Sequence, residues 1–511
     1  MLFPTLSIFL GLAWANGQFK SRPDLAPPVL NITIPATSDT AEGLLFFAPS
    51  GYYPPATNHG PAQEGPYIFT QDGDLVWSGF GYAPPGSENF RVQKFKGQDV
   101  LTIFQGSHNS PMGHGHGHST IFNNRYQAIK RVHGAGHELA DHHEFLIFND
   151  TTAIFTVYDP EQRDLTPYGA TSQSQNWILN NKVQKVDVNT NKLLWEWHSL
   201  DHVDPADTNL TLNEGHAGLG TNSSQAWHYF YMNAADVNPE QNTYLFSARS
   251  MCSIFKVDGA TGKPIWRLGG KNSDFQLGEG VDFCWQHDTR FLKSFQGHKT
   301  QGTKEIISFF DNSAHENLTG GDDLTTRPYS EGKVVEIDTA QHTATLLASF
   351  RVPEDLSVRS QGNNQILEND NAFINWGYKG YISEHKPDGT PIFFAHLGSG
   401  ALGKGIQNYR AFRFNWHATP IEDPALVAFQ TESGTEIYVS WNGDTETKTW
   451  KFYDQHQTLL GETSRTGFET NLTVSSHPDF ITAQAFDQNG SRLVTSPPTK
   501  PVAFAAPLNF Q

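Results

Sequence analysis

Cysteine is scarce in this chain, which has only Cys252 and Cys284 among its 511 residues. A fold stapled by several disulfides is therefore excluded. Both cysteines lie in otherwise apolar segments. They form either one bridge between neighbouring strands or two small buried side chains, and the sequence leaves both possibilities open.

Basic residues and membrane-length apolar runs are also lacking. The chain has 35 Lys and Arg against 53 Asp and Glu, a formal net charge of −18. Sequence-independent nucleic-acid binding depends on clustered lysine and arginine, so we expect no nucleic-acid partner. After the first residues, no segment has the roughly 18 consecutive apolar residues that a membrane span requires. The composition does not indicate an oligomeric state.

Short cofactor motifs are absent as well. The sequence contains no nucleophile elbow, phosphate-binding loop or dinucleotide fingerprint. The glycines of GKNSDFQLGEG, near Gly270, do not form a phosphate motif. We therefore expect no cofactor.

The beginning of the chain predicts export. Its first residues, MLFPTLSIFLGLAWANG, form an apolar run that ends in small residues, although no Lys or Arg precedes it. This pattern predicts a secretory signal peptide over residues 1–17. Asn-X-Ser/Thr sequons support a secreted glycoprotein, located outside the cell or in the lumen of the secretory pathway. The predicted glycosylation sites are Asn31, Asn149, Asn209, Asn222, Asn317, Asn471 and Asn489.

What is present is a β-rich pattern. The chain has 45 Gly, 29 Pro and 13% aromatic residues, which predicts an all-β protein with many turns and a large core. Six segments share a hairpin turn followed, four positions later, by a bulky apolar residue. They are FTQDGDLVW (Gly73, Trp77), IFNNRYQAI (Arg125, Ile129), KVDVNTNKLLW (Asn191, Trp195), KVDGATGKPIW (Gly262, Trp266), EIDTAQHTATL (His342, Leu346) and EHKPDGTPIF (Gly389, Phe393).

These repeats predict a six-bladed β-propeller over residues 44–420. A four-stranded sheet cannot bury both faces alone, whereas sheets stacked radially cover each other, with the large hairpin residues between them. A stack of unrelated β-sandwiches is the alternative, but it does not explain the shared spacing. Residues 18–43 are predicted to be an extended N-terminal arm. Short alternating strands predict a small C-terminal β-sandwich over 425–511.

Polar residues at the ends of predicted strands are the candidate site. Asn233, Arg249, His287 and Arg290 each end or follow a different apolar strand. If they converge on the propeller axis, they form a cationic, donor-rich pocket suited to an anionic group or a developing oxyanion.

Two further segments contribute weaker candidates. In DHHEF, His143 and Glu144 either point into a central cavity or pair with each other to orient a strand end. Trp376 and Tyr378 of INWGY, with NYRAF (Tyr409, Arg410), offer stacking surface for a flat ligand. Aromatic residues of β proteins are more often core, which is the competing interpretation.

The run MGHGHGHST holds His114, His116 and His118. On a strand, alternation places all three on one face, where imidazoles bind zinc or copper. The intervening glycines instead favour a loop with solvated or locally bonded histidines. We prefer the loop and assign no metal site from the sequence.

The chain resembles the fungal arylsulfotransferase-like proteins of the ASST family over most of residues 40–420. The resemblance is carried by D-x-H-E-F, VQKVDVNTNKLLWEWHSLDHV, NTYLFSARS, TGKPIWRLGGKNSDF, QHDTR, FFDN and INWGY. It implies a six-bladed propeller with a site at one end of its central channel. In the bacterial relatives, an aryl sulfate gives its sulfuryl group to a histidine, and a phenol then takes it up without a nucleotide donor.

The same resemblance implies roles for individual residues. His287 is similar to the histidine that accepts the group, Arg249 and Asn233 to residues that hold sulfate oxygens, and His143 to another pocket histidine. The family strand commonly reads F-H-x-N, and here Tyr231 stands where a pocket histidine is expected. Tyrosine donates hydrogen bonds but is a poor base near neutral pH.

Three functions are therefore compatible with the sequence. The first is a secreted transferase that moves sulfate from an aryl sulfate to a phenol. The second is a fungal secondary-metabolism enzyme that cyclises or isomerises a polyphenol or polyketide on the same propeller. The third is a non-catalytic propeller that binds a small aromatic ligand or a glycan.

Overall fold

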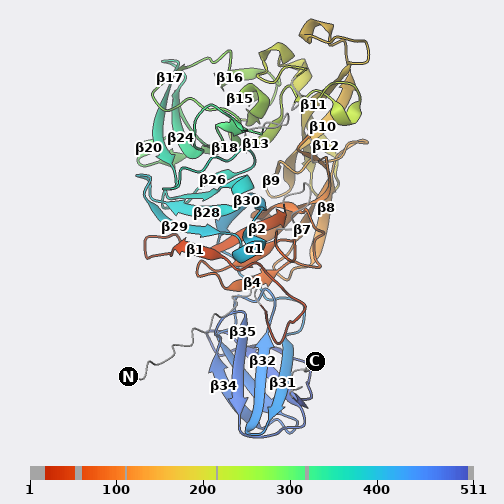
Figure 1. The fold of residues 1–511 in the computed structure, drawn as a ribbon, viewed down its shortest axis with the longest axis vertical. Coiled ribbons are helices and arrows are strands. Elements are labelled where there is room, and N and C mark those ends of the chain that lie inside the picture. Colours follow the sequence, from red (N-terminus) through yellow and green to blue (C-terminus); the bar gives the residue numbers. More distant parts are fainter. Residues whose placement is uncertain (1–17, 52–59, 110–111, 214–216, 317–321, 504–511) are drawn as a thin grey trace, which may run out of the picture.

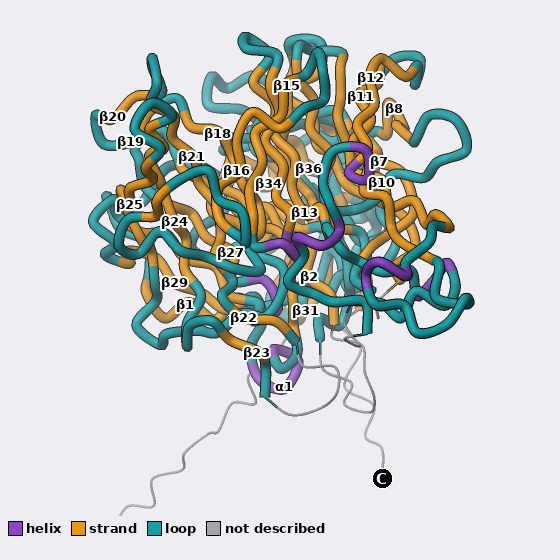
Figure 2. The backbone as a smooth tube through the Cα atoms, turned by 90° about the horizontal axis from the view of Figure 1, so that it is seen from above, coloured by secondary structure: helices purple, strands orange, loops and turns teal. Residues whose placement is uncertain are grey.

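A computed structural model describes residues 18–51, 60–109, 112–213, 217–316 and 322–503. The predicted signal peptide and the sequon Asn317 lie outside these residues. Strands dominate the described chain (Figures 1 and 2), which confirms the all-β prediction. Within the described residues the helical elements are single turns, and none of them is long and apolar enough to cross a membrane. They are α1 (Gly400–Gly403), η1 (Thr166–Tyr168), η2 (Ser199–Asp201), η3 (Pro205–Asp207), η5 (Ser223–Gln225), η6 (Arg249–Met251) and η7 (Gly377–Lys379).

Between residues 31 and 414, the described chain forms six sheets of four or five strands. The first two sheets contain β30 (Ile406–Phe414), β2 (Leu44–Gly51), β3 (Tyr67–Phe69) and β4 (Leu75–Ser78), and then β5 (Glu88–Phe95), β6 (Gln98–Asn109), β7 (His114–Phe122) and β8 (Ala128–His133). The third and fourth contain β9 (Phe145–Phe148), β10 (Thr152–Gln162), β11 (Trp177–Asp187) and β12 (Leu193–His198), and then β13 (Met232–Asn238), β14 (Thr243–Ala248), β15 (Ser253–Asp258) and β16 (Pro264–Gly269).

The remaining two sheets have five strands each. The fifth contains β18 (His287–Leu292), β21 (Lys304–Asp311), β24 (Glu331–Asp338), β25 (Thr343–Phe350) and β17 (Gln276–Leu277). The sixth contains β26 (Asn363–Ile366), β27 (Ala372–Asn375), β28 (Tyr381–His385), β29 (Pro391–His396) and β1 (Asn31–Ile34). Two short ribbons add β19 (Ser294–Phe295), β20 (His298–Lys299), β22 (Ala314–His315) and β23 (Leu324–Thr325).

All six predicted hairpins are present, each joining two adjacent strands of a different sheet. Their large residues differ in burial. Trp77 and Trp266 are buried, and Trp195 stacks on Tyr244 of the next sheet with 4.4 Å between ring centroids. Ile129 is 45% exposed, so the prediction that every hairpin fills the space between sheets is wrong for that copy.

Neighbouring sheets pack in chain order around a common centre. Strands β9, β13, β18 and β26 lie toward the middle of the upper part of Figure 1. Each sheet contacts the next, and β26 of the sixth contacts β30 of the first, so the order of contacts returns to its start. Strand β30 pairs with β2 antiparallel, which joins the late part of this region to its beginning.

The N-terminal segment also joins distant parts of the sequence. Residues 18–43 do not only extend over the surface, because β1 pairs antiparallel with β29 as the outer strand of the sixth sheet. Before β1, the Ser21 hydroxyl lies 2.7 Å from that of Ser440 and donates to Glu469.

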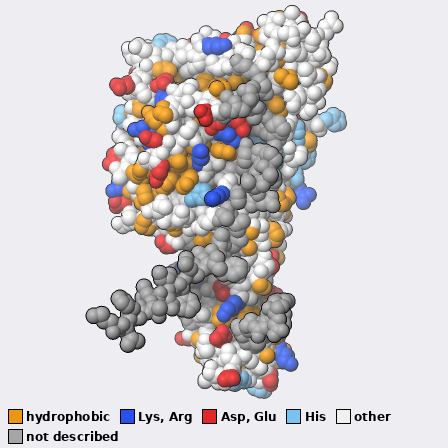
Figure 3. Space-filling view, viewed as in Figure 1, with side chains coloured by type: hydrophobic (Ala, Val, Ile, Leu, Met, Phe, Trp, Pro, Cys, Tyr) orange, Lys and Arg blue, Asp and Glu red, His pale blue; other side chains and the backbone are white. Residues whose placement is uncertain are grey.

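The end of the chain forms two further sheets, which lie at the bottom of Figure 1. Their facing side chains enclose a separate core that includes Ile437, Trp450 and Phe452. Hydrogen bonds fix these sheets to the first six, as when Tyr126 donates to the carbonyl of Gly443 at 2.7 Å. On the face drawn in Figure 3, Lys and Arg are interspersed with Asp and Glu. The two sheets contain β31 (Ala425–Thr431), β32 (Gly434–Ser440), β35 (Glu469–Val474) and β38 (Val502–Ala503), and β33 (Thr449–Asp454), β34 (Leu459–Ser464), β36 (Ile481–Phe486) and β37 (Arg492–Thr495).

Candidate functional site

Polar residues from several sheets meet near the inner strands. Asn233 lies in β13, Arg249 begins η6 directly after β14, His287 begins β18, and His143 lies two residues before the start of β9. All four are at least nine-tenths buried. Polar groups that end inner strands of neighbouring sheets are brought close together, although they are far apart in the sequence.

Two partners fix the tautomer of His287, which is 3% exposed. Its Nδ1 lies 2.6 Å from Asn312 Oδ1, while Asn312 Nδ2 donates to two backbone carbonyls. The Asn312 oxygen is therefore an acceptor, and Nδ1 carries the proton. His287 Nε2 accepts the backbone N–H of Gln361 at 3.2 Å, so it keeps its lone pair. This arrangement keeps the imidazole neutral, because a second proton on Nε2 would point at the backbone N–H of Gln361, which is itself a donor.

Arg249 supplies positive charge beside His287. Its guanidinium lies 5.1 Å from the ring centroid of Tyr231 and 5.7 Å from that of Trp285, and it donates to the carbonyl of Arg359 at 3.0 Å. Burial lowers the pKa of His287 well below its ordinary value, and the charge of Arg249 lowers it further. A neutral imidazole beside a guanidinium suits nucleophilic attack on an anion, because the cation attracts the anion and the imidazole supplies the electron pair.

His143 faces the same site. Its ring centroid lies 5.5 Å from that of Tyr231, and its Nδ1 lies 2.5 Å from Asp141 Oδ1. The partner of this histidine is therefore Asp141, not the Glu144 considered from the sequence. The Tyr409 hydroxyl lies 3.3 Å from the carbonyls of both His143 and Asn233.

Asn233 is held against the segment that leads to His287. Its Nδ2 donates to the carbonyl of Gln286 at 2.7 Å. Its Oδ1 is a buried atom without a hydrogen-bond partner among the described residues. The amide group is thus held against the residue that precedes His287.

Tyr231 forms part of the aromatic wall around these groups. Its hydroxyl donates to the carbonyl of Gly113 at 2.8 Å, and its ring centroid is 5.5 Å from that of His143. Burial raises the pKa of Tyr231 to about 12, although Arg249 acts in the opposite direction. Tyr231 therefore stays neutral near pH 7 and contributes a ring surface rather than a base.

The preferred loop interpretation of the HGHGH run is wrong. His114, His116 and His118 lie in strand β7, which pairs with β6 along its length. His114 is buried, stacks on Tyr158 with 5.2 Å between centroids, and has its Nδ1 3.0 Å from Nε2 of His228.

His228 was missed by the sequence analysis. It is buried, and its ring centroid lies 4.7 Å from that of Tyr231. It stands in an aromatic run, WHYFYM, where hydrophobic context concealed it.

Arg290 belongs to a layer of ion pairs rather than to an open anion site. Its guanidinium lies 2.6 Å from Asp288 and 2.7 Å from Glu144. Arg410 lies 3.2 Å and Arg91 3.8 Å from the same Glu144. Burial would raise the pKa of Glu144, but the three arginines lower it to about 2. The layer is therefore charged, and its guanidinium groups are already occupied by carboxylates.

The two aromatic candidates separate in the structure. Trp376 is fully buried in a hydrophobic core with Phe310 and Phe350, and its indole N–H donates to Ser383 at 2.8 Å. It is not placed to line a pocket with His287, so the core interpretation holds for Trp376. Tyr378 is partly buried, and the guanidinium of Arg359 lies 3.9 Å from its ring centroid. Arg359 in turn accepts the hydrogen bond from Arg249, so Tyr378 is linked to Arg249 through Arg359.

Cys252 and Cys284 form a disulfide. Cys252 directly follows η6, which begins at Arg249, and Cys284 shortly precedes His287. The bridge therefore ties together the two segments that carry the guanidinium and the imidazole.

The predicted glycosylation sites lie mainly at the surface. Asn209 is half-buried. Side chains are exposed at the remaining described sequons, which are Asn31, Asn149, Asn222, Asn471 and Asn489.

Residues 91–398 match the model of the family described as Arylsulfotransferase (ASST), which is more than half of the chain. The chain belongs to the arylsulfotransferase family. No curated protein matches it. A solved protein of unknown function from Bacteroides caccae is 10% identical, with a TM-score of 0.39, covering 73% of this chain and 98% of that one. A structure titled "Structure of Dos1 propeller" is 8% identical, with a TM-score of 0.27, covering 91% and 95%. At these scores neither structure informs function.

The neutral state of His287 in this arylsulfotransferase-family protein predicts a flat pH profile. An ordinary histidine with a pKa of about 6.5 would lose roughly fourfold in neutral fraction between pH 7.5 and 6. Because the pKa of His287 is lowered, we expect the rate of phenol release from an aryl sulfate to change much less. Single-turnover kinetics with a donor whose leaving phenol ionises below pH 6 measures this directly. A fourfold fall would contradict the buried, neutral imidazole.

The lowered pKa of His287 should also make the stability of the folded chain depend on pH. The unfolded chain binds more protons than the folded chain below about pH 6.5, because the pKa of His287 is lower in the folded state. The free energy of unfolding should therefore fall as the pH is lowered from about 6.5 toward the pKa of the folded state.

Trp376→Ala is expected to affect stability and not substrate affinity. Removing a fully buried indole leaves a cavity, which lowers the free energy of unfolding by about 3–5 kcal/mol. Urea unfolding measures the loss, and Trp376→Phe, which keeps most of the volume, should lose less. An increased KM for an aryl sulfate with unchanged stability would instead place Trp376 in the substrate pocket.

Proposed function

We propose that this member of the arylsulfotransferase family transfers a sulfuryl group from an aryl sulfate to a phenolic acceptor, with His287 as the covalent carrier. We also propose that the six sheets are the blades of a closed six-bladed β-propeller over residues 44–420, followed by a small β-sandwich over 425–511. The cyclic order of sheet contacts and the pairing of β30 with β2 support the propeller.

The observation that carries the function is the neutral imidazole of His287 beside the buried guanidinium of Arg249. In the first step, Nε2 forms a bond to sulfur as the bond from sulfur to the aryl oxygen breaks, and the aryl oxide leaves. Nε2 must give up its 3.2 Å hydrogen bond from Gln361 to do so. We infer that Arg249 and the second N–H of the Asn233 amide stabilise charge on the sulfuryl oxygens, as donors do in phosphoryl transfer, while the other N–H keeps its bond to the Gln286 carbonyl.

In the second step, the oxygen of the acceptor phenol forms a bond to sulfur and the bond from Nε2 to sulfur breaks. The acceptor's proton passes to solvent, from which the aryl oxide released in the first step takes up a proton if its pKa lies above the pH, so atoms and charges balance. The histidine returns to its neutral state. The ring of Tyr231, which is only partly buried, gives flat substrates a surface on which to stack.

Export is part of the proposal. Disulfides persist in oxidising compartments, and the Cys252–Cys284 bridge together with exposed sequons supports a secreted location. The cognate aryl sulfate and phenol are not defined by these features.

Steady-state kinetics with an aryl sulfate and a phenol tests the transfer. A covalent carrier predicts ping-pong kinetics, with parallel lines in double-reciprocal plots at several acceptor concentrations. Arg249→Lys should lower kcat by about 100-fold or more, because lysine does not offer the same paired donors. Transfer with intersecting lines, or no transfer by the wild-type protein to any phenol tested, would contradict the proposal.

A second candidate is an enzyme that cyclises or isomerises a polyphenol or polyketide. It is favoured by one observation, the enclosure of the site by tyrosine and histidine rings, including the stacked pair His114 and Tyr158. Conversion of such a substrate by His287→Ala at the wild-type rate would support this candidate over sulfuryl transfer.

A further inference from the structure

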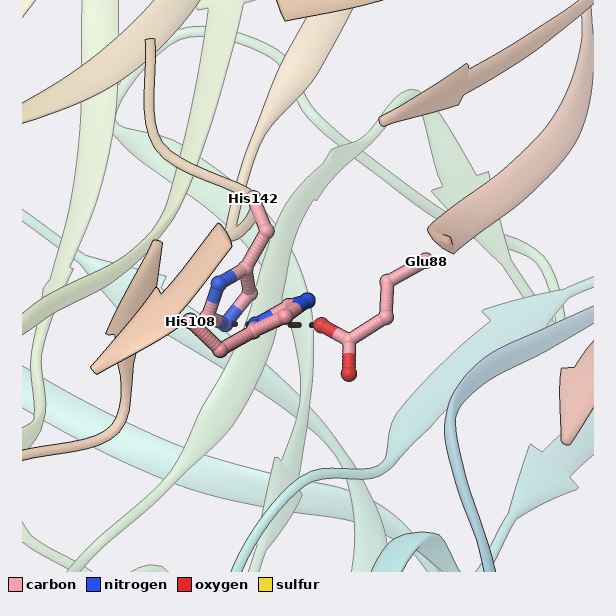
Figure 4. Close-up of side chains that lie close together, drawn as sticks. All are labelled: Glu88, His108 and His142. Atoms are coloured by element: carbon pink, nitrogen blue, oxygen red, sulfur yellow. Dashed lines mark ion pairs between the residues drawn. The ribbon is translucent and has the colours of Figure 1, made fainter. Parts of the chain in front are cut away.

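Beside the sulfuryl site lies a second cluster, made of Glu88, His108 and His142. Glu88 begins β5, His108 lies near the end of β6, and His142 precedes β9. One potential ligand atom from each residue lies within 4.8 Å of the others. Figure 4 shows the two imidazoles and the carboxylate directed toward one another.

Two polar atoms of this cluster lack a hydrogen-bond partner among the described residues. His142 is 6% exposed, and its Nε2 lies 3.6 Å from Glu88 Oε2, which is too long for a hydrogen bond. Glu88 Oε2 and His142 Nδ1 are buried atoms that have no hydrogen-bond partner within the described part of the chain. Burying polar atoms in this way costs free energy unless a partner is supplied.

The separation of these atoms suits a metal ion. Zinc binds nitrogen and oxygen ligands at about 2.0–2.2 Å with tetrahedral geometry, which places two ligands roughly 3.3–3.6 Å apart. His142 Nε2 and Glu88 Oε2, at 3.6 Å, are already near this distance. A direct ion pair would instead bring the two atoms into hydrogen-bond contact.

One of the two histidines has the outer hydrogen-bond partner that metal-ligating histidines usually have. A ligating histidine usually donates its second N–H to a carbonyl or carboxylate. Nε2 of His108 lies 2.7 Å from the carbonyl of Gly86, which leaves Nδ1 with a free lone pair. Nδ1 of His142 lies 3.6 Å from Oδ2 of Asp141, beyond hydrogen-bond distance, so of the two histidines His108 alone has this outer partner among the described residues.

Glycine at position 115 makes room for this ring. A Cβ there would lie 2.7 Å from Nδ1 of His142, closer than real Cβ contacts allow. Gly115 of the HGHGH run therefore leaves space for the His142 ring, which a larger residue at this position would displace.

We propose that Glu88, His108 and His142 bind a divalent transition-metal ion of the zinc class, with an open fourth position. Two histidines and one carboxylate with an open position is a ligand set used by catalytic zinc sites. The ring of His142 stacks on that of His143 with 4.1 Å between centroids, and Tyr409 is 5.2 Å away. The open position thus lies beside the aromatic site, where a phenolic oxygen is a suitable fourth ligand.

Zinc binding by the full-length chain without an affinity tag tests the proposal. After treatment with a chelator and dialysis, isothermal titration with Zn²⁺ should give one site per chain, and elemental analysis should find one zinc. His108→Ala and His142→Ala should each weaken binding by about 100-fold or more, since loss of an outer partner alone costs 10–100-fold. His298→Ala, which removes a half-exposed histidine outside the cluster, should bind as the wild type does.

Cobalt provides a second readout that does not depend on activity. Co²⁺ bound with four ligands should give visible absorption bands that disappear in His108→Ala and His142→Ala. Circular dichroism shows whether each variant is folded, and His108→Gln replaces any alanine variant that is not. A wild-type chain that binds no zinc, or folded variants that bind zinc as tightly as the wild type, would overturn the proposal. Neither result would bear on sulfuryl transfer, which uses His287.

Discussion

His287→Ala is expected to abolish sulfuryl transfer. If the imidazole is the carrier, its loss removes the covalent path, and removal of a nucleophile that acts as a unit with its neighbours costs about 10⁴–10⁶ in kcat. The rate of phenol release from an aryl sulfate measures the effect. The residual rate should be close to that of the uncatalysed reaction with the same donor.

The control for this prediction is His298→Ala. His298 is half-exposed and pairs with Glu336 on the surface, away from the inner strands. Its substitution should leave both kcat and the free energy of unfolding nearly unchanged. If a folded His287→Ala variant keeps more than about a tenth of wild-type kcat, His287 is not the covalent carrier of the sulfuryl group.

Glu144→Gln is expected to cause the largest loss of stability among single substitutions at the site. The carboxylate is fully buried and lies within 4.0 Å of Arg91, Arg290 and Arg410. Glutamine keeps the shape but removes the charge, which leaves buried guanidinium groups without full compensation. Breaking a buried pair in this way costs about 3–5 kcal/mol, which urea unfolding resolves easily.

A surface glutamate provides the comparison. Glu462 lies 3.0 Å from Lys451, and both side chains are substantially exposed. Glu462→Gln should leave the free energy of unfolding nearly unchanged, because solvent screens exposed pairs. Equal stability losses at Glu144 and Glu462 would show that the ion-pair layer does not stabilise the inner strands.

Much of the strand pattern is legible in the sequence because it is local. Each predicted hairpin is encoded by its own turn residues, such as Gly73, Gly262 and Gly389, which adopt positive φ. The large residue after the turn is a weaker signal. Burial depends on the neighbouring sheet, and the exposed Ile129 shows that the same spacing can end at the surface.

Long-range pairing is not legible in the same way. Nothing in residues 31–34 distinguishes a strand that completes a distant sheet from an extended arm, and the partner β29 lies more than 350 residues later. The HGHGH strand was obscured for a different reason. Glycine weakens strands, but at Gly115 and Gly117 a Cβ would collide with His142 and with the carbonyl of Gln105. These glycines permit close approach within a sheet.

The site was predicted in part. Their positions at strand ends pointed to His287, Arg249 and Asn233 together, because inner strands end together whatever their separation in sequence, whereas His143 was a separate candidate from the DHHEF segment. Position at a strand end could not say which charges already have partners. Arg290 pairs with Asp288 of its own strand and with Glu144, which comes just before β9 of another sheet.

The most direct test of the central claim is mass spectrometry of the protein after brief reaction with an aryl sulfate in the absence of an acceptor. We expect one sulfuryl group per chain, located on the peptide that contains His287, and we expect it to disappear when a phenol is added. A sulfuryl group on the peptide of His143 or His228, or no covalent group during turnover, would contradict the account.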